Sequence, residues 1–197
     1  MLIHICGIDG SGKTTLAKNL QRFYSSSHFL ELSANTKLIN QVNQICSKLE
    51  SNRWNEFDNY FRSILWADEL IGLTSICNVN NDMYFVDRYK LCNLIYSQLE
   101  DSTSLKVLKK IHKMIPDPDL IIFLDTPISI AQNRIKCRGG YSSPKEFPEN
   151  MKIADKLYRE YLSKYNKTVY YLDGSKSKRV VLDQAIRSIN TFLKGAI

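Results

Sequence analysis

A glycine-rich segment near the start of the chain carries the clearest chemistry in the sequence. Gly7-Ile8-Asp9-Gly10-Ser11-Gly12-Lys13-Thr14 matches the pattern GxxxxGK(S/T) at every fixed position. In this pattern the glycines let successive backbone N–H groups point at a phosphate, the lysine reaches the β/γ oxygens, and the last hydroxyl binds Mg²⁺. The sequence therefore predicts a site for a nucleoside triphosphate. The residues expected to bind it are Gly7, Gly10, Ser11, Gly12, Lys13, Thr14 and Thr15.

The flanks of this loop have the order that the motif needs. Leu2-Ile3-His4-Ile5-Cys6 is a short apolar run suited to a buried strand, and Leu16 and Leu20 begin a helical period after the loop. A helix N-terminus favours anions through its free N–H groups and its macrodipole. We therefore expect the phosphates where these two effects coincide.

Strands and helices alternate along the rest of the chain. The further strands expected are His28 to Leu32, Met83 to Asp87, Leu120 to Leu124 and Val169 to Leu172. Helices are expected at about 13–25, 37–50, 55–77, 89–99, 103–114, 128–137, 150–165 and 179–193. This alternation predicts an α/β fold with a parallel sheet covered on both faces, whose ligands bind beyond the carboxyl ends of the strands.

Composition narrows the class of protein. The 197 residues, 44% of them hydrophobic, predict one domain spanning 1–197, and the apolar runs are too short to cross a bilayer. Five cysteines without metal spacing indicate free thiols in a reducing compartment, so we expect a soluble, cytoplasmic protein with no membrane partner. The net charge of +7 is scattered, and the cluster Lys176 to Arg179 is interpreted as a solvated helix start, so no nucleic-acid partner is expected.

Two further segments carry a resemblance to a known family. Val86-Asp87-Arg88-Tyr89 follows an expected strand, and the run Pro118 to Asp125 leads to Arg134-Ile135-Lys136-Cys137-Arg138-Gly139. Together with the loop, these motifs resemble the thymidylate kinase family of nucleoside monophosphate kinases across most of the chain. The resemblance implies a three-layer P-loop kinase fold with a five-stranded parallel sheet, ATP and Mg²⁺ as cofactors, and phosphoryl transfer to a small nucleotide, expected to be dTMP. Many members of the family are dimers, which leaves a homodimer open.

Phosphoryl transfer requires alignment and cations where charge spreads over the equatorial oxygens. Arg134 and Arg138 are four apart at an expected helix end, so both can project from one face toward a triphosphate; a solvated helix terminus is the alternative. The catalytic candidates are Lys13, Arg88, Arg134 and Arg138. Asp87 is expected to help Thr14 hold Mg²⁺, unless it is only a buried structural carboxylate.

The segment after these arginines is expected to move. In the family a mobile lid follows such a helix, and Gly139 to Pro144 has the composition of a mobile segment, so a lid is expected at about 138–148. Gly10 occupies a position where some members carry an arginine. The chain therefore resembles the subgroup that supplies an arginine from the lid.

The acceptor side departs from the family pattern. The family has an aromatic residue and, four residues later, an arginine on the long helix before the third strand, whereas here Arg62 and Trp66 occupy these positions in exchanged order. Such a pair can still present a cation and a ring on one face, although Trp66 can equally be a core residue. Ser97 replaces the usual glutamine. The acceptor-binding candidates are Asp9, Lys37, Phe61, Arg62, Trp66, Arg88 and Tyr96.

Other classes remain as alternatives. The sequence lacks the base-reading element Asn/Thr-Lys-x-Asp of a regulatory GTPase, because Asn166-Lys167-Thr168-Val169 has valine at the last position. Asp68-Glu69 is interpreted as a charged helix face rather than as the Asp-Glu motif of an ATPase. A kinase of deoxynucleosides or of a specialised metabolite is the main rival. A deoxynucleoside kinase needs a carboxylate base after the second strand, where Glu31 is nearby but within the expected strand. A non-catalytic nucleotide-binding protein is the third class.

Overall fold

A five-stranded parallel sheet forms the centre of the molecule. The computed structural model describes residues 1–31, 54–77, 82–100 and 102–195. The strands are β1 (Leu2–Cys6), β2 (Ser27–Glu31), β3 (Met83–Asp87), β4 (Leu120–Asp125) and β5 (Val169–Asp173). Their order in the sheet is β2-β3-β1-β4-β5, and every neighbouring pair is parallel. The predicted sheet is therefore confirmed.

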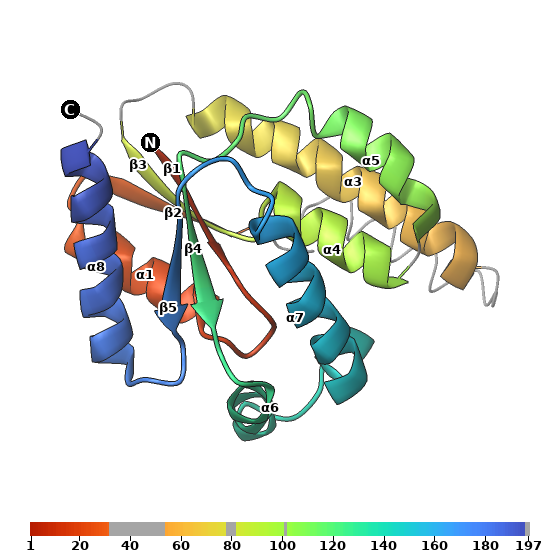
Figure 1. Ribbon diagram of the computed structural model, residues 1–197. Coiled ribbons are helices and arrows are strands. Elements are labelled where there is room, and N and C mark those ends of the chain that lie inside the picture. The colour runs from red at the N-terminus through yellow and green to blue at the C-terminus, as the bar shows by residue number, and fades with distance from the viewer. Residues whose placement is uncertain (32–53, 78–81, 101, 196–197) are drawn as a thin grey trace.

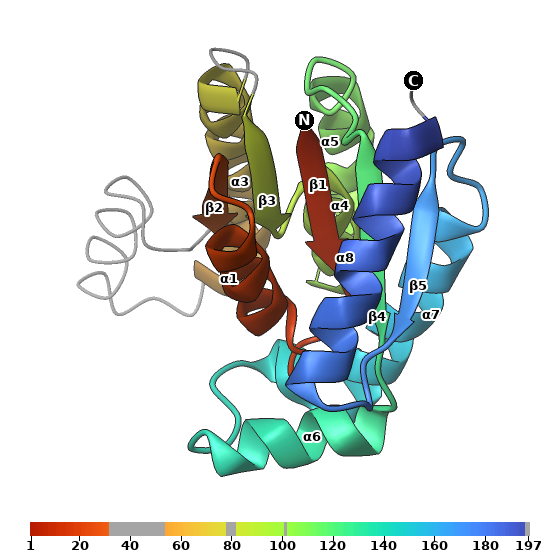
Figure 2. The same ribbon diagram turned by 90° about the vertical axis from the view of Figure 1, so that its left-hand side faces the viewer.

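Helices cover both faces of this sheet. In Figure 1, one face of the sheet is covered by α1 (Lys13–Phe23) and α8 (Lys178–Gly195). The other face is covered by α3 (Trp54–Cys77), α4 (Lys90–Glu100) and α7 (Pro148–Leu162), with α5 (Leu105–Ile111) beside them. Figure 2 shows α6 (Ile128–Cys137) crossing beyond the carboxyl ends of the strands. The three-layer α/β class is confirmed, whereas the helix predicted at 37–50 lies outside the described residues.

The hydrophobic core has a part on each face of the sheet, because successive side chains of a strand point to opposite faces. Ile3 and Ile5 of β1 pack with Leu16 and Leu20 of α1, the residues whose spacing predicted that helix. Side chains of opposite parity, such as Cys6, join the core under α4 and α7. All residues of β1 are buried, as a strand covered on both faces requires.

The helix predicted at 103–114 is interrupted. Ser102–Ser104 forms a short 3-10 turn, α5 then runs only from Leu105 to Ile111, and turns follow. Serine and threonine bond readily to nearby backbone groups and favour caps and turns over helix interiors. A second 3-10 turn, η2 (Pro144–Glu146), precedes α7.

The register of the central strands brings their carboxyl ends together. Ile5 of β1 pairs with Asp87 of β3, Cys6 pairs with Phe123 of β4, and Glu31 at the end of β2 also pairs with Asp87. The glycine loop that follows β1 is therefore flanked by the ends of β3 and β4. This edge of the sheet positions the site described below.

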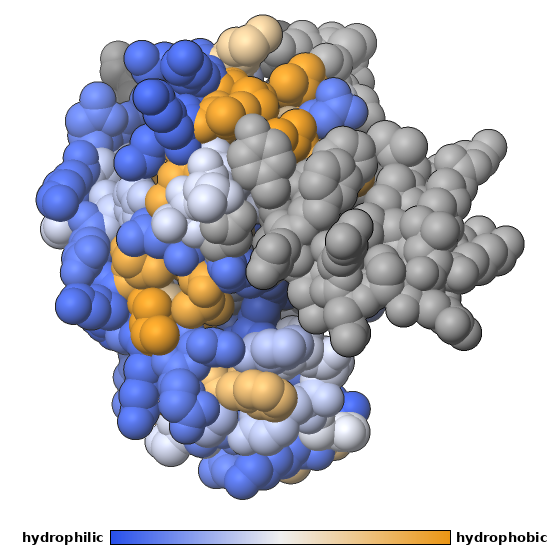
Figure 3. Space-filling view, turned by 90° about the vertical axis from the view of Figure 1, so that its right-hand side faces the viewer, coloured by the Kyte–Doolittle hydropathy of each residue, from blue (hydrophilic) through white to orange (hydrophobic). Residues whose placement is uncertain are grey.

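The face carrying α4, α5 and α7 is mostly hydrophilic where it is described. Figure 3 shows apolar groups on this face that are separated from one another by hydrophilic residues. Among the described residues, no helix combines the length and apolarity needed to span a membrane.

Candidate functional site

The glycine loop between β1 and α1 requires its glycines. Gly7, Gly10 and Gly12 have φ of 143°, 80° and 105°, a region that residues with a Cβ rarely adopt. A Cβ on Gly10 would also lie 2.4 Å from the backbone oxygen of Ala131 in α6. An arginine at this position would collide with α6, so the loop itself cannot supply one in this arrangement.

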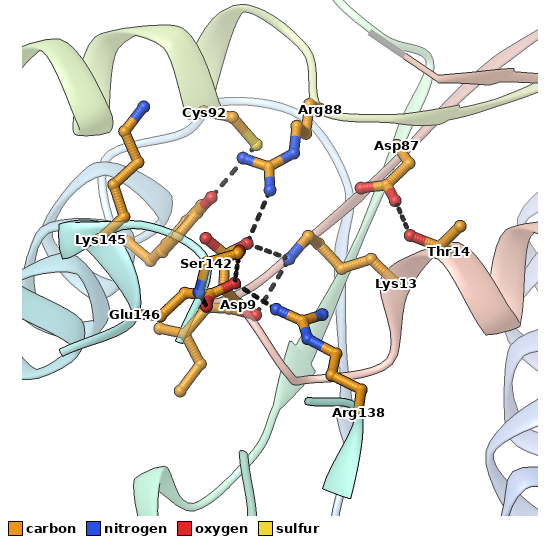
Figure 4. A network of polar contacts seen from close by, with 12 residues as sticks. Asp9, Lys13, Thr14, Asp87, Arg88, Cys92, Arg138, Ser142, Lys145 and Glu146 are labelled. Carbon is orange, nitrogen blue, oxygen red and sulfur yellow. Dashed lines mark hydrogen bonds and ion pairs between the residues drawn. The ribbon is translucent and has the colours of Figure 1, made fainter. Parts of the chain in front are cut away.

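Two cations converge on the carboxylate of Asp9. Arg88 Nη2 lies 2.8 Å from Asp9 Oδ1, and Lys13 Nζ lies 3.4 Å from the same oxygen. Lys13 also donates to the backbone oxygen of Ile8 at 3.0 Å. Figure 4 shows Asp9 between the two cations. Burial alone would raise the pKa of Asp9, but Arg88 and Lys13 outweigh it and hold the pKa at about 2.

Arg88 reaches this cluster from a strained turn. It follows β3 with φ 71°, and it is the only residue besides glycine with positive φ in the described part of the chain. Its guanidinium also lies 5.7 Å from the centre of the Tyr96 ring. Burial would lower the pKa of Arg88, but the Asp9 carboxylate raises it above its ordinary value. The turn therefore holds a permanent cation beside the glycine loop.

A hydroxyl and a carboxylate meet on the other side of Lys13. Thr14 Oγ1 donates a hydrogen bond to Asp87 Oδ2. Asp87 is buried, and its Oδ1, like the buried Ser11 Oγ, has no hydrogen-bond partner among the described residues. Buried polar atoms are rarely left unpaired, so the chemistry of these two oxygens fits a bound phosphate and a bound cation. A hydroxyl with one carboxylate suits Mg²⁺, which takes few protein ligands and completes its shell with water and phosphate.

Arg134 and Arg138 do not point to one place, contrary to the expectation from their spacing. Arg134 donates from Nη1 to the backbone oxygen of Ser11 at 3.0 Å and from Nη2 to that of Gly174 at 2.9 Å. It ties the glycine loop to the turn between β5 and α8. It also borders a cavity of about 240 Å³. The lining residues include Thr15, Leu16, Asn19, Ser177, Lys178 and Val181.

Arg138, one residue beyond α6, belongs instead to the segment that was predicted as a lid. Its Nη2 forms an ion pair with Glu146 Oε1. The buried Glu146 also accepts bonds from Ser142, at 2.7 Å from the backbone N and at 3.0 Å from Oγ. One carboxylate therefore organises this segment around Arg138, which stays half exposed.

The predicted acceptor residues are described only in part. Tyr96 and Trp66 are buried, and Lys145 Nζ lies 5.1 Å and 5.4 Å from the centres of their rings. Trp66 is thus both a core residue and part of the wall of a small pocket between α3 and α4. The other residues that line this pocket are Ser63, Asn93, Tyr96, Ser97, Glu100 and Lys145. Lys37 and the side chains of Phe61 and Arg62 lie outside the described residues.

Three features of the site were not predicted from the sequence. They are Lys145 beside the two rings, Glu146 as the partner of Arg138, and the turn after β5 that completes the cavity at Arg134. The basic cluster from Lys176 onward was a usable signal for this turn, because it follows the end of a parallel strand. No pattern marked Lys145 or Glu146.

A glycine loop between the first strand and its helix, with Lys13 and Arg88 at the carboxyl edge of a parallel sheet, defines a P-loop phosphotransferase. The thymidylate kinase family model matches residues 5–185. The chain therefore belongs to the thymidylate kinase family, whose members are nucleoside monophosphate kinases.

Two relatives agree with this assignment, and solved structures share the fold. The chain is 33% identical over 193 residues to a protein named probable thymidylate kinase 1 from Saccharolobus solfataricus, covering 95% of this chain and 96% of that protein. It is 32% identical over 179 residues to a probable thymidylate kinase from Metallosphaera sedula, covering 88% and 84%. The solved thymidylate kinase from Candida albicans, at 19% identity, superposes with a TM-score of 0.74 and coverages of 96% and 91%. A deoxyadenosine kinase from M. mycoides shares the fold at a TM-score of 0.71, 16% identity and coverages of 96% and 100%.

Proposed function

We propose that this protein transfers the γ-phosphoryl group of ATP to dTMP, forming dTDP and ADP. One observation carries the proposal: Lys13 of the glycine loop and Arg88 of the turn after β3 converge on Asp9. Donor and acceptor phosphates have to meet between such cations, because the transferred group spreads negative charge over its oxygens. The acceptor phosphate is already anionic and needs no general base. Its oxygen attacks the γ-phosphorus, and the bond to the β–γ bridging oxygen breaks.

The donor side is assigned to the glycine loop and to the cavity beside Arg134. Gly7, Gly10, Ser11, Gly12 and Thr15 supply the phosphate cradle together with Lys13 and Thr14. We place the donor base in the 240 Å³ cavity, where Arg134 is held by two backbone oxygens. In this arrangement Arg134, which lines the cavity, interacts with the bound ATP. Arg138 is the arginine that the lid, about 138–148, brings to the transferring group.

Thr14 and Asp87 are the residues that would hold Mg²⁺. Their hydroxyl and carboxylate are already joined, and Asp87 has a buried oxygen to spare. The cation, when bound, neutralises charge on the β- and γ-phosphate oxygens. Lys13 then aligns the same oxygens from the glycine loop.

The acceptor side is assigned to Asp9, Arg88, Tyr96 and Trp66, and to Lys37, Phe61 and Arg62 of the predicted set. Arg88 is suited to the acceptor phosphate, because it is a fixed cation next to Lys13. Tyr96 lies beside Arg88 and lines a pocket with Trp66. We further propose a single domain over 1–197 acting in the cytoplasm, with a homodimer as the assembly to be tested by light scattering.

An ADP-release assay with ATP and Mg²⁺ tests the function. The acceptors are dTMP, other nucleoside monophosphates, deoxynucleosides and sugar phosphates. We expect dTMP to give the highest kcat/KM, whereas turnover of a deoxynucleoside in its place would favour the rival kinase, with Glu31 as the candidate base.

The matched variants are Lys13→Met and Lys18→Met, two lysines of α1 of which only the first is buried. We expect Lys13→Met to lose at least about 100-fold in kcat, as for the loss of one charge-stabilising donor, and Lys18→Met to lose little. ATP binding without turnover of any acceptor would indicate a nucleotide-binding protein instead.

A further inference from the structure

Lys145 of η2 extends from the lid region into the pocket between α3 and α4. Its Nζ lies within the range of a cation–π contact to two rings, 5.4 Å from Trp66 and 5.1 Å from Tyr96. The same ammonium forms an ion pair with Glu100 Oε1 at 2.9 Å, and the side chain is only 16% exposed. Figure 4 shows Lys145 extending away from Arg138 toward α4. Three contacts therefore hold this cation inside the molecule.

This pocket adjoins the cluster of Asp9 and Arg88. Arg88 and Lys145 both lie within cation–π distance of the Tyr96 ring, and the charge of Lys145 helps to lower the pKa of Asp9. A nucleoside monophosphate whose phosphate binds Arg88 would therefore direct its base toward Trp66 and Tyr96. The assignment of this pocket to the acceptor base rests on the proposed function.

The pocket has no room for a base while Lys145 is in place. Its free volume is about 10 Å³, which is roughly enough for one water molecule. Trp66 Nε1, a buried donor in its wall, has no hydrogen-bond partner among the described residues. The walls offer aromatic faces and polar atoms of the kind that a base uses, but the ammonium occupies the space.

We propose that Lys145 is an internal occupant of the acceptor-base pocket, and that the base of the nucleoside monophosphate displaces it on binding. The base takes over the ring faces of Trp66 and Tyr96, and the ammonium returns to solvent. Part of the stacking energy is spent on releasing the three contacts of Lys145. Removing the ammonium should therefore strengthen acceptor binding.

Calorimetric titration with dTMP tests the proposal on the full chain. We expect Lys145→Ala, which removes the ammonium and its alkyl chain from the pocket, to bind dTMP roughly threefold to tenfold more tightly than the wild type. Lys152→Ala removes an exposed lysine of α7 and should leave the dissociation constant within about twofold. Unchanged or weaker binding of dTMP by Lys145→Ala overturns the proposal, since it would make Lys145 a bystander or a direct ligand.

A ligand without a base separates displacement from a general charge effect. 2-Deoxyribose 5-phosphate presents the same phosphate to Arg88 but does not enter the base pocket. We expect Lys145→Ala to leave its binding unchanged or slightly weaker, because one nearby positive charge is lost. Equal tightening for this ligand and dTMP would overturn the proposal.

Fluorescence distinguishes failure of this proposal from failure of the proposed function. In a Trp54→Phe background, Trp66 is the only tryptophan. We expect Lys145→Ala to increase the quenching of Trp66 by acrylamide, and dTMP to reverse the increase. Unchanged quenching with intact turnover of dTMP overturns the role of Lys145 alone. Increased quenching with neither binding nor turnover of dTMP, in either protein, shows instead that the acceptor was wrongly assigned, and the proposal falls with it.

Discussion

Arg88 and Asp9, 79 positions apart in the sequence, lie in direct contact with 2.8 Å between Nη2 and Oδ1. The contact joins the glycine loop after β1 to the strained turn after β3. Because Lys13 approaches the same oxygen, one carboxylate holds two cations close together in a buried place. The site is thus preorganised, with its positive charges balanced by Asp9.

Replacing Asp9 tests this balance. Asp9→Asn leaves Arg88 and Lys13 close together without their counter-charge, so we expect the free energy of unfolding to fall by roughly 2–4 kcal/mol. ATP should restore part of the loss, because its phosphates supply negative charge to the same cations. Urea denaturation with and without ATP measures both effects. Asp183→Asn, at an exposed position of α8, is the control and should change stability by less than about 0.5 kcal/mol.

The pair of Thr14 and Asp87 predicts how the enzyme depends on Mg²⁺. In Asp87→Asn the hydroxyl of Thr14 keeps a hydrogen-bonding neighbour, but the negative charge is lost. We expect the Mg²⁺ concentration for half-maximal rate to rise about 10-fold to 100-fold at saturating ATP. Asp68→Asn is the control, since Asp68 is an exposed residue of α3. A larger effect at Asp68 than at Asp87 would contradict the assignment of the metal ligands.

The fold could be predicted from local patterns because the three central strands of the sheet are buried on both faces. The runs around Ile5, Phe85 and Ile122 are mostly apolar, and they are separated by helical periods and turn residues. The glycine loop was equally clear, because its backbone conformation demands glycine at fixed positions. Both features depend on residues that are close in the sequence.

The arginines show where sequence reasoning fails. The spacing of Arg134 and Arg138 predicted a common direction, but the helix ends between them, at Cys137. Beyond that point the chain turns at Gly139. Arg138 forms an ion pair with Glu146, whereas Arg134 donates a hydrogen bond to the backbone oxygen of Ser11. Helical spacing fixes directions only while the helix lasts, and contacts with distant segments decide the rest.

Glu146 is expected to set the position of Arg138. Its carboxylate accepts from Arg138 and from both the backbone N and the hydroxyl of Ser142. Glu146→Gln removes the charge that attracts the guanidinium, so we expect kcat to fall roughly 10-fold while the KM for ATP changes little. Glu149→Gln, an exposed residue in the first turn of α7, is the control.

A double-mutant cycle separates positioning from a general loss of structure. If Glu146 acts through Arg138, the change Glu146→Gln should cost much less in an Arg138→Met background than in the wild type. Additive effects on kcat would show that the two residues act independently. Thermal unfolding of each variant identifies any contribution from reduced stability.

Two buried histidines predict that the free energy of unfolding decreases as the pH is lowered, before most carboxylates are protonated. Burial lowers the pKa of His4 to about 3, helped by Lys13 and Lys90, and burial with Lys90 lowers the pKa of His112 to about 4. Both rings are therefore neutral in the folded protein, and His112 Nε2 bonds to Asn93 Oδ1 at 2.8 Å. The unfolded chain binds protons at these rings below about pH 6.5.

The sign of the effect follows from this difference in bound protons. Between about pH 6.5 and 4 the unfolded state holds more protons than the folded state, so the free energy of unfolding decreases as the pH falls. With two such groups the slope should approach about 2–3 kcal/mol per pH unit near pH 5. Urea denaturation at pH 7, 6 and 5 measures it. His112→Gln should remove about half of the slope and leave the half that His4 supplies. An undiminished slope in His112→Gln would contradict the neutral state of this ring in the folded protein, because only a neutral buried imidazole gives the unfolded state its extra proton.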